Sequence, residues 1–151
     1  MRLTERLAAD AREALRARDG FRLSALRLAR AALQNAAIEK RSELEDTDAI
    51  AVLAREIRQR REAAEEYRRL GRDDAAAGLE REAAILGAYL PPPLTGDELD
   101  GMIREAIVET GAASQRDLGR VMAVLMPRLR GRADGGAVNL RLRELLPPPQ
   151  A

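Results

Sequence analysis

The stretch Leu90-Pro91-Pro92-Pro93-Leu94 divides this chain of 151 residues into two parts. Proline fixes φ and has no backbone N–H, so three prolines in a row end a helix and favour a stiff, extended spacer. The sequence therefore predicts two units, over residues 1–90 and 95–146, joined by a proline linker over residues 91–94. A second proline triplet begins at Pro147, and we expect residues 147–151 to form a disordered tail.

The sequence on both sides of the linker is helical in character. It contains 29 Ala and 22 Leu, which are among the best helix formers. Before the linker, apolar residues spaced three and four apart predict four helices. Gly20 and Gly71 mark the ends of the first and third, and Gly111 is expected to end the first helix after the linker. We expect Gly20 to take the left-handed conformation that closes the first helix. Short loops make such helices pack antiparallel to their neighbours, so residues 1–90 are predicted to form a four-helix, bundle-like unit.

Capping residues set the remaining helix boundaries. Asp46 or Thr47 is expected to cap the third helix. After the linker, the residues that open three short helices are Thr95 with Glu98, Ser114 with Asp117, and Asp134. The second of these helices is predicted to break near Pro127. The predicted fold class is all-α, with a small C-terminal three-helix unit after the larger one.

Charge is distributed unevenly although the formal net charge is only +1. Residues 91–110 hold one Arg and five acidic side chains (1 − 5 = −4), whereas residues 111–151 hold seven Arg and three acidic side chains (7 − 3 = +4). The cations are 25 Arg and one Lys. Arginine suits bidentate recognition of phosphate, but a GC-rich genome gives the same bias, and the arginines are spread over the whole chain.

Several classes of chemistry are excluded by residue types that the chain lacks. Without Cys or His there is no thiolate nucleophile, no Ser-His or Cys-His relay and no zinc site of the usual kind. The acidic cluster Glu43, Glu45, Asp46 and Asp48 falls at a helix junction, where acids favour a helix N-terminus. No catalytic residue, metal site or cofactor is predicted.

No apolar run approaches the roughly 20 residues that span a bilayer, and the chain start lacks an apolar signal region. We therefore expect a cytoplasmic protein without membrane contact.

The third predicted helix carries many arginines with glutamates interleaved among them. The pairs spaced four apart are Glu56–Arg60, Arg58–Glu62, Arg61–Glu65 and Glu65–Arg69. Side chains at this spacing meet on one face of a helix. We therefore interpret this face as solvated and laced with salt bridges rather than as an RNA contact.

The candidate binding residues lie in the C-terminal unit. Arg128, Arg130 and Arg132 alternate in a glycine-containing loop ahead of a predicted helix start, which is a suitable phosphate cradle. Arg116 and Arg120 are four apart and are predicted to project from one helix face. The structural alternative is that these arginines balance Asp117, Asp134 and Glu144 within a small fold.

Several sequence blocks together resemble the GatB/YqeY domain family. These blocks are Ser24-Ala25-Leu26-Arg27-Leu28, Lys40-Arg41-Ser42-Glu43-Leu44, Glu56-Ile57-Arg58-Gln59-Arg60-Arg61-Glu62, Tyr67 through Gly71-Arg72-Asp73, Tyr89-Leu90-Pro91, Asp117-Leu118-Gly119-Arg120-Val121-Met122, Leu125-Met126-Pro127 and Gly131-Arg132-Ala133-Asp134-Gly135. Their order covers nearly the whole chain. The sequence departs from the usual pattern at Pro92-Pro93, where a more polar pair is common, and in its proline-rich tail.

This resemblance implies a helical bundle followed by a small helical domain. In the family, the domain also forms the tail of the GatB subunit of tRNA-dependent amidotransferases, where it is thought to engage tRNA while the chemistry occurs elsewhere. The resemblance therefore brings with it a label of carbon–nitrogen ligase with glutamine as amido-N donor, but this chain has the tail without the catalytic cradle.

Taken together, the sequence predicts a non-catalytic module that binds tRNA or other structured RNA, accessory to amidotransferase subunits. Phosphate contacts would supply the affinity, because no aromatic residue follows Tyr89 to stack on bases. The alternative is a helical protein–protein interaction module without an RNA role. In that case the acidic segment 95–110 and the basic segment 111–146 would mediate self-association or partner docking.

Overall fold

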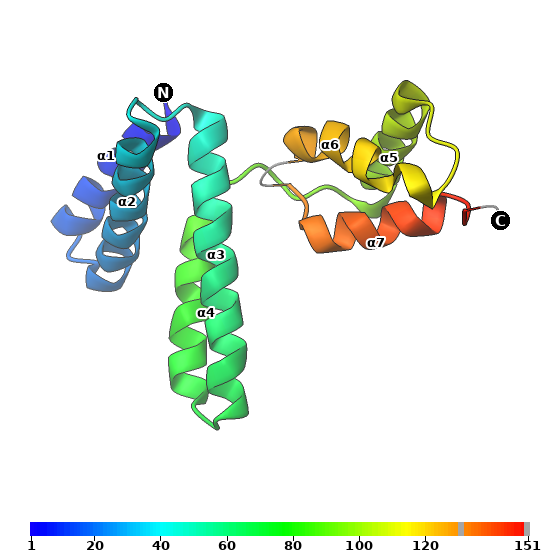
Figure 1. Ribbon diagram of the computed structural model, residues 1–151. Coiled ribbons are helices and arrows are strands. Elements are labelled where there is room, and N and C mark those ends of the chain that lie inside the picture. Colours follow the sequence, from blue (N-terminus) through cyan, green and yellow to red (C-terminus); the bar gives the residue numbers. More distant parts are fainter. Residues whose placement is uncertain (130–131, 150–151) are drawn as a thin grey trace. The chain divides into compact units, whose positions relative to one another are not determined.

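The computed structural model of the protein describes residues 1–129 and 132–149 (Figure 1). These residues form helices and connecting loops without any strand, which confirms the all-α prediction. The elements are α1 (Leu3–Arg16), α2 (Gly20–Lys40), α3 (Asp46–Arg69), α4 (Asp73–Gly87), α5 (Gly96–Thr110), the 3-10 helix η1 (Gln115–Asp117), α6 (Leu118–Leu129) and α7 (Gly135–Leu145). The chain divides into two compact units, which we call unit 1 (Met1–Leu90) and unit 2 (Pro91–Ala151).

Unit 1 is built from two helical hairpins, α1–α2 and α3–α4. Each helix contributes one leucine with no exposed surface to the shared core: Leu7, Leu26, Leu53 and Leu86. The buried cluster ends at Ile57 on α3 and begins again at Ala83 on α4. The distal half of the α3–α4 hairpin therefore lies outside this core.

Small side chains and ion pairs hold the distal half of that hairpin together. Ala64 and Ala76 are fully buried. Arg60 on α3, only 8% exposed, bonds Glu56 Oε2 at 2.8 Å and Glu82 Oε2 of α4 at 3.2 Å. The prediction of a wholly solvated charged face is therefore corrected at Arg60, because α4 covers that guanidinium.

Two of the four predicted ion pairs on α3 form. The Glu56–Arg60 pair is confirmed, and Glu65 lies 4.0 Å from Arg69. Arg58–Glu62 and Arg61–Glu65 are not among the pairs within 4.0 Å in the described residues. Arg68 instead reaches across to Glu80 on α4 at 2.6 Å, and this contact lowers the pKa of the Glu80 carboxyl. Ion pairs thus form both along α3 and between α3 and α4.

The loop after α1 differs from the prediction. Arg18, with φ 58°, takes the left-handed conformation that we expected of Gly20. Gly20 instead begins α2, because the Asp19 carboxylate caps that helix by accepting from the Arg22 N–H at 3.1 Å. At Gly71 and Gly111, by contrast, φ values of 74° and 66° confirm the predicted glycine stops.

The start of α3 is also displaced from the expected cap. Glu45, rather than Asp46 or Thr47, is the N-cap residue, and its N–H donates to Asp48 Oδ2 at 3.1 Å. Asp46 lies in the first turn and accepts from the Leu3 N–H at 2.9 Å. Asp46 therefore ties the start of α1 to the start of α3, a tertiary role that local capping rules do not reveal.

Tyr89, just after α4, contacts α1, and these contacts change the pKa of its hydroxyl. Its side chain is 7% exposed, its hydroxyl donates to Asp10 Oδ2 at 2.5 Å, and the Arg6 guanidinium lies 5.2 Å from the ring centroid. Burial, followed by the bond to Asp10, raises the pKa of Tyr89 to about 12. The folded protein therefore holds the Tyr89 phenol in its neutral form to a higher pH than the unfolded chain does.

We predict that this raised pKa makes unit 1 lose stability in alkali. The stabilisation is complete below the unfolded pKa near 10 and is lost as pH rises toward 12, so about 1.5 kcal/mol should disappear between pH 10 and 11.5. Urea unfolding of the wild type and of Tyr89→Phe at both pH values measures this effect. Equal pH slopes in the two proteins would contradict the prediction.

Unit 2 packs α5, α6 and α7 around its own core. Its fully buried side chains are Ile103, Ala106, Val121, Leu125, Leu129, Val138 and Leu142. Three predicted caps are confirmed. Thr95 Oγ1 accepts from the Glu98 N–H at 3.2 Å, and Asp134 Oδ2 accepts from the Ala137 N–H at 3.1 Å. Ser114 forms the predicted capping box with Asp117, although it opens the 3-10 helix η1 rather than α6 directly. Unit 2 therefore has helix starts that local sequence patterns identified correctly.

Helix α6 continues through Pro127, contrary to the predicted break. The proline lies in the last turn, where its missing N–H removes one bond of the helix. Continuation to Leu129 places that side chain, with no exposed surface, in the core of unit 2. Burial of Leu129 offsets the cost of the proline, and this is a tertiary effect.

Segments that the sequence treats as linker and tail are partly bonded within unit 2. The Leu94 N–H donates to the Arg132 carbonyl at 3.1 Å, and the Gln115 N–H donates to the Pro147 carbonyl at 3.0 Å. The predicted tail is thus anchored at its first residue, and residues 150–151 lie outside the described residues.

No helix in the described part of the chain is long and apolar enough to cross a membrane.

Candidate nucleic-acid interface

The arginines predicted around the α6–α7 connection are engaged in ion pairs. Arg128, in the last turn of α6, donates to Glu109 Oε2 of α5 at 2.7 Å. Arg132 lies 3.8 Å from Glu98 Oε2, and its Nε donates to the Pro92 carbonyl at 3.5 Å. Arg130 lies outside the described residues. Of this predicted triplet, the structure therefore describes two, and both face carboxylates of α5.

Arg116 and Arg120 do not share one α-helix as predicted. Arg116 lies in η1, which precedes α6, and Arg120 lies in the first turn of α6. The cause is Asp117, whose carboxylate accepts from the Ala113 N–H at 2.8 Å and so fixes a tight 3-10 turn. Backbone bonds and then the Arg120 charge lower the pKa of Asp117, and Arg120 pairs with it at 3.0 Å.

A further ion pair of unit 2 was missed by the sequence reasoning. Arg141 on α7 holds Asp100 on α5 through two bonds of 2.7 Å, and it also bonds Glu144 at 2.7 Å. The bond to Arg141 lowers the pKa of the Asp100 carboxyl. Asp100 and Arg141 are 41 positions apart, so no local spacing signals the contact.

The acidic helix and the basic segments of unit 2 thus pair with one another inside the unit. Glu98, Asp100 and Glu109, all on α5, each face an arginine from beyond residue 127. The structural alternative is therefore confirmed at Asp117, which pairs with Arg120, whereas the α5 carboxylates were not among the partners that it named. The charge asymmetry, since it is largely satisfied within the unit, no longer argues for self-association.

These pairs nevertheless lie at the surface. The Arg128 side chain is 43% exposed and its partner Glu109 is 50% exposed. Arg120 and Arg132 also retain more than a third of their surface. Exposed ion pairs contribute only about 0–1 kcal/mol. Breaking one of these pairs therefore costs little.

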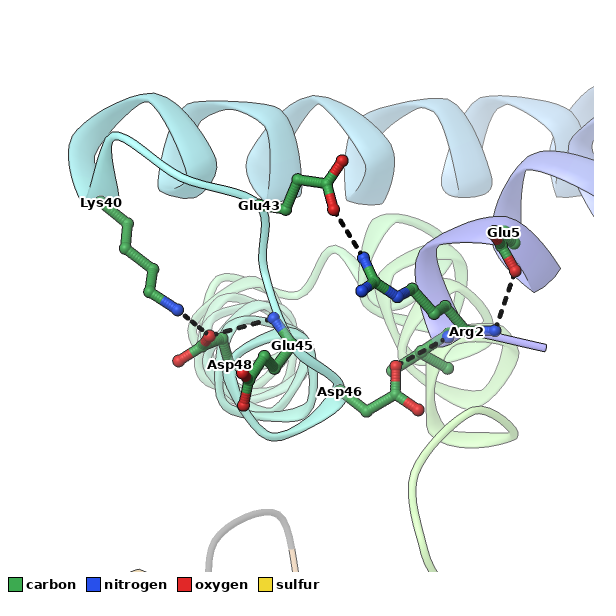
Figure 2. A network of polar contacts seen from close by, with 8 residues as sticks. Arg2, Glu5, Lys40, Glu43, Glu45, Asp46 and Asp48 are labelled. Carbon is green, nitrogen blue, oxygen red and sulfur yellow. Dashed lines mark hydrogen bonds and ion pairs between the residues drawn. The ribbon is translucent and has the colours of Figure 1, made fainter.

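Figure 2 shows how the acidic cluster at the α2–α3 junction is satisfied. Glu43 accepts from Arg2 at 2.8 Å, Asp46 caps the Leu3 N–H, and Asp48 lies 2.7 Å from Lys40 Nζ. The cluster thus acts as a junction of α1, α2 and α3. Over residues 1–129 and 132–149, no group of three or more acidic side chains is arranged to hold a metal ion.

Comparison with known proteins places these features in a family context. The family model for YqeY-like proteins matches residues 4–146 and so spans both units. One relative, from Pyrenophora tritici-repentis, is named "Altered inheritance of mitochondria protein 41, mitochondrial". It is 25% identical over 144 residues, and the match covers 93% of this chain and 79% of the relative.

Proposed function

The chain belongs to the YqeY-like family, and on that premise we propose that it binds structured RNA of the tRNA class through unit 2. The observation that carries the proposal is the set of exposed ion pairs at Arg120, Arg128 and Arg132. Each guanidinium is already oriented by a carboxylate that a phosphate can replace. The resemblance to the GatB tail supports tRNA as the class of RNA.

The geometry also indicates how tightly such RNA would bind. Displacing condensed counterions from phosphates provides affinity, with a slope of about −0.9 in log K against log salt for each contact on duplex nucleic acid. Because each arginine must first leave Glu98, Glu109 or Asp117, part of this gain is offset. We therefore expect weak, strongly salt-dependent binding.

The binding should follow RNA shape rather than base sequence. The three aromatic residues of the chain all precede the linker, so unit 2 offers no aromatic side chain that can stack on a base. Backbone contacts position RNA without distinguishing bases, and helical RNA is recognised largely by its shape. Affinities for different tRNAs should accordingly be similar.

An accessory role beside amidotransferase subunits is part of the same proposal. We predict that the purified chain by itself has no glutamine-dependent amide-forming activity, because it has no Cys or His to activate a nucleophile or relay a proton. Assays of glutamine and ATP turnover measure this directly. Stoichiometric turnover by the isolated chain would contradict the prediction.

The arginines are tested with a triple variant, Arg128→Gln/Arg130→Gln/Arg132→Gln. Glutamine keeps the polar stem and removes the charge, so we expect tRNA affinity at low salt to fall by about tenfold or more, equivalent to a loss of about 1.4 kcal/mol. Circular dichroism should show unchanged helicity.

The matched control is Arg55→Gln/Arg58→Gln/Arg61→Gln on α3. These three arginines are exposed, and none lies within 4.0 Å of a carboxylate oxygen in the described part of the chain. The control removes the same charge, and we expect it to change affinity by less than about threefold. Equal losses in both triple variants would show that net charge alone, and not unit 2, governs binding.

A further inference from the structure

Helix α2 is the most one-sidedly basic helix of unit 1. Its first acidic residue is Glu39, one position before the helix ends. Arg27 is exposed and Arg30 half-buried. Among the ion pairs within 4.0 Å of the described residues, neither arginine appears, whereas in unit 2 Arg120, Arg128, Arg132 and Arg141 all pair with carboxylates. Neither Arg27 nor Arg30 therefore has a carboxylate oxygen within 4.0 Å among the described residues.

The spacing of these residues places them together. Arg27, Arg30 and Gln34 are three and four positions apart, so they share one face of α2. We call this set the α2 arginine face. Over seven residues the face runs about 10 Å along the helix axis, which is long enough to meet more than one phosphate of a nucleic-acid strand.

A hollow lies beside the α2 arginine face, bordered by α1, α2 and the loop that follows α2. It measures about 360 Å³, and its polar lining includes Arg30, Gln34 and Thr4. The two carboxylates that line it are already bonded: Glu43 to the Arg2 side chain at 2.8 Å and Glu5 to the Arg2 N–H at 3.0 Å (Figure 2). Arg30 is thus the charged group in the hollow that lacks a partner.

We propose that the α2 arginine face binds phosphates of the RNA backbone, with one phosphate held in the hollow by Arg30 and Gln34 and a neighbouring one by Arg27. This inference rests on the proposed RNA binding and adds unit 1 to its contact surface. A guanidinium offers paired N–H donors that match phosphate oxygens, and the Gln34 amide and Thr4 hydroxyl supply further donors. Because these arginines need not leave a carboxylate first, each contact here should cost less than one in unit 2.

The test compares two charge-matched double variants in tRNA binding. Arg27→Gln/Arg30→Gln removes two charges from the α2 arginine face. Arg12→Gln/Arg16→Gln removes two from α1, where both side chains are exposed and neither is paired with a carboxylate in the described residues. We expect the α2 variant to lose about fivefold or more in affinity and to reduce the salt slope by roughly two. The α1 variant should change affinity by less than about twofold.

The outcomes separate this inference from the proposed function. If the intact chain binds no tRNA at low salt, the proposed function fails and this inference fails with it. If the intact chain binds but the two double variants bind equally well, the α2 assignment alone is wrong. Poly-glutamate serves as a second probe: binding as tight as that of tRNA, and lost only in the α2 variant, would assign the face to an acidic protein and overturn the RNA assignment.

Discussion

Leu125→Ala is expected to unfold unit 2 while unit 1 stays folded. Leu125 has no exposed surface and lies in the centre of a core made by three short helices. Truncating a buried leucine to alanine costs about 2.7–5 kcal/mol. A unit of this size has a stability of only a few kcal/mol, so one such cavity is enough to unfold it.

Amide hydrogen exchange resolved by segment measures this result. Protection of backbone amides should be lost in α5, α6 and α7 and retained in α1 to α4. The helical circular dichroism signal should fall in proportion to the fraction of helical residues that lie in unit 2. Val108→Ala is the control, because Val108 is 80% exposed and surface substitutions usually stay within about 0.5 kcal/mol. Retained protection in unit 2, or loss of protection in both units together, would show that the units are not independent.

Arg60→Ala should have the second-largest effect, on unit 1. Removing the guanidinium leaves the carboxylates of Glu56 and Glu82, which are 19% and 22% exposed, without their shared counter-charge. Breaking a buried ion pair from one side costs about 3–5 kcal/mol. Since both carboxylates keep some contact with water, we expect a loss of about 2–3 kcal/mol of unfolding free energy.

Urea unfolding of the wild type and of Arg60→Ala measures this loss, with Arg58→Ala as the matched control. Arg58 lies on the same helix but is exposed and unpaired with a carboxylate in the described residues, so its truncation should change stability by less than about 0.5 kcal/mol. Adding Glu82→Gln to Arg60→Ala should restore part of the loss, because it removes one of the two facing negative charges. Similar stabilities for the two arginine variants would contradict the account.

Features governed by local sequence were predicted well. The helical content, the glycine stops at Gly71 and Gly111 and the caps at Thr95 and Asp134 depend on residues within one turn of each other. Such local signals survive in the fold because tertiary packing does not oppose them. Membership of the family likewise followed from sequence blocks and is confirmed by the match over residues 4–146.

Features governed by distant contacts were missed. Asp46 was expected as a cap of α3, but it accepts from the Leu3 N–H, 43 positions away. Pro127 was expected to end α6, but burial of Leu129 extends the helix past it. Burial of Arg60 depends on Glu82, which is 22 positions away. Periodicity along one helix contains no information on what the neighbouring helix places opposite.

The candidate site shows the same limit. The sequence identified the basic segment of unit 2 but not the carboxylates that face it, such as Glu109 beside Arg128, 19 positions away. A count of charges could not show that Arg120, Arg128, Arg132 and Arg141 of unit 2 are paired with carboxylates. Nor could it show that Arg27 and Arg30 of α2 have no such pair within 4.0 Å among the described residues. That distinction requires the positions of the side chains, and it is the reason why we propose the α2 arginine face as an additional RNA contact.

The central claim, that this chain binds structured RNA through its arginines, is tested most directly by titrating the intact protein with tRNA over a series of salt concentrations. We predict measurable binding at low salt, with log K falling linearly against log salt at a slope of several negative units, since each phosphate contact contributes about −0.7 to −0.9. No detectable binding at low salt, or an affinity that does not change with salt, would contradict the claim.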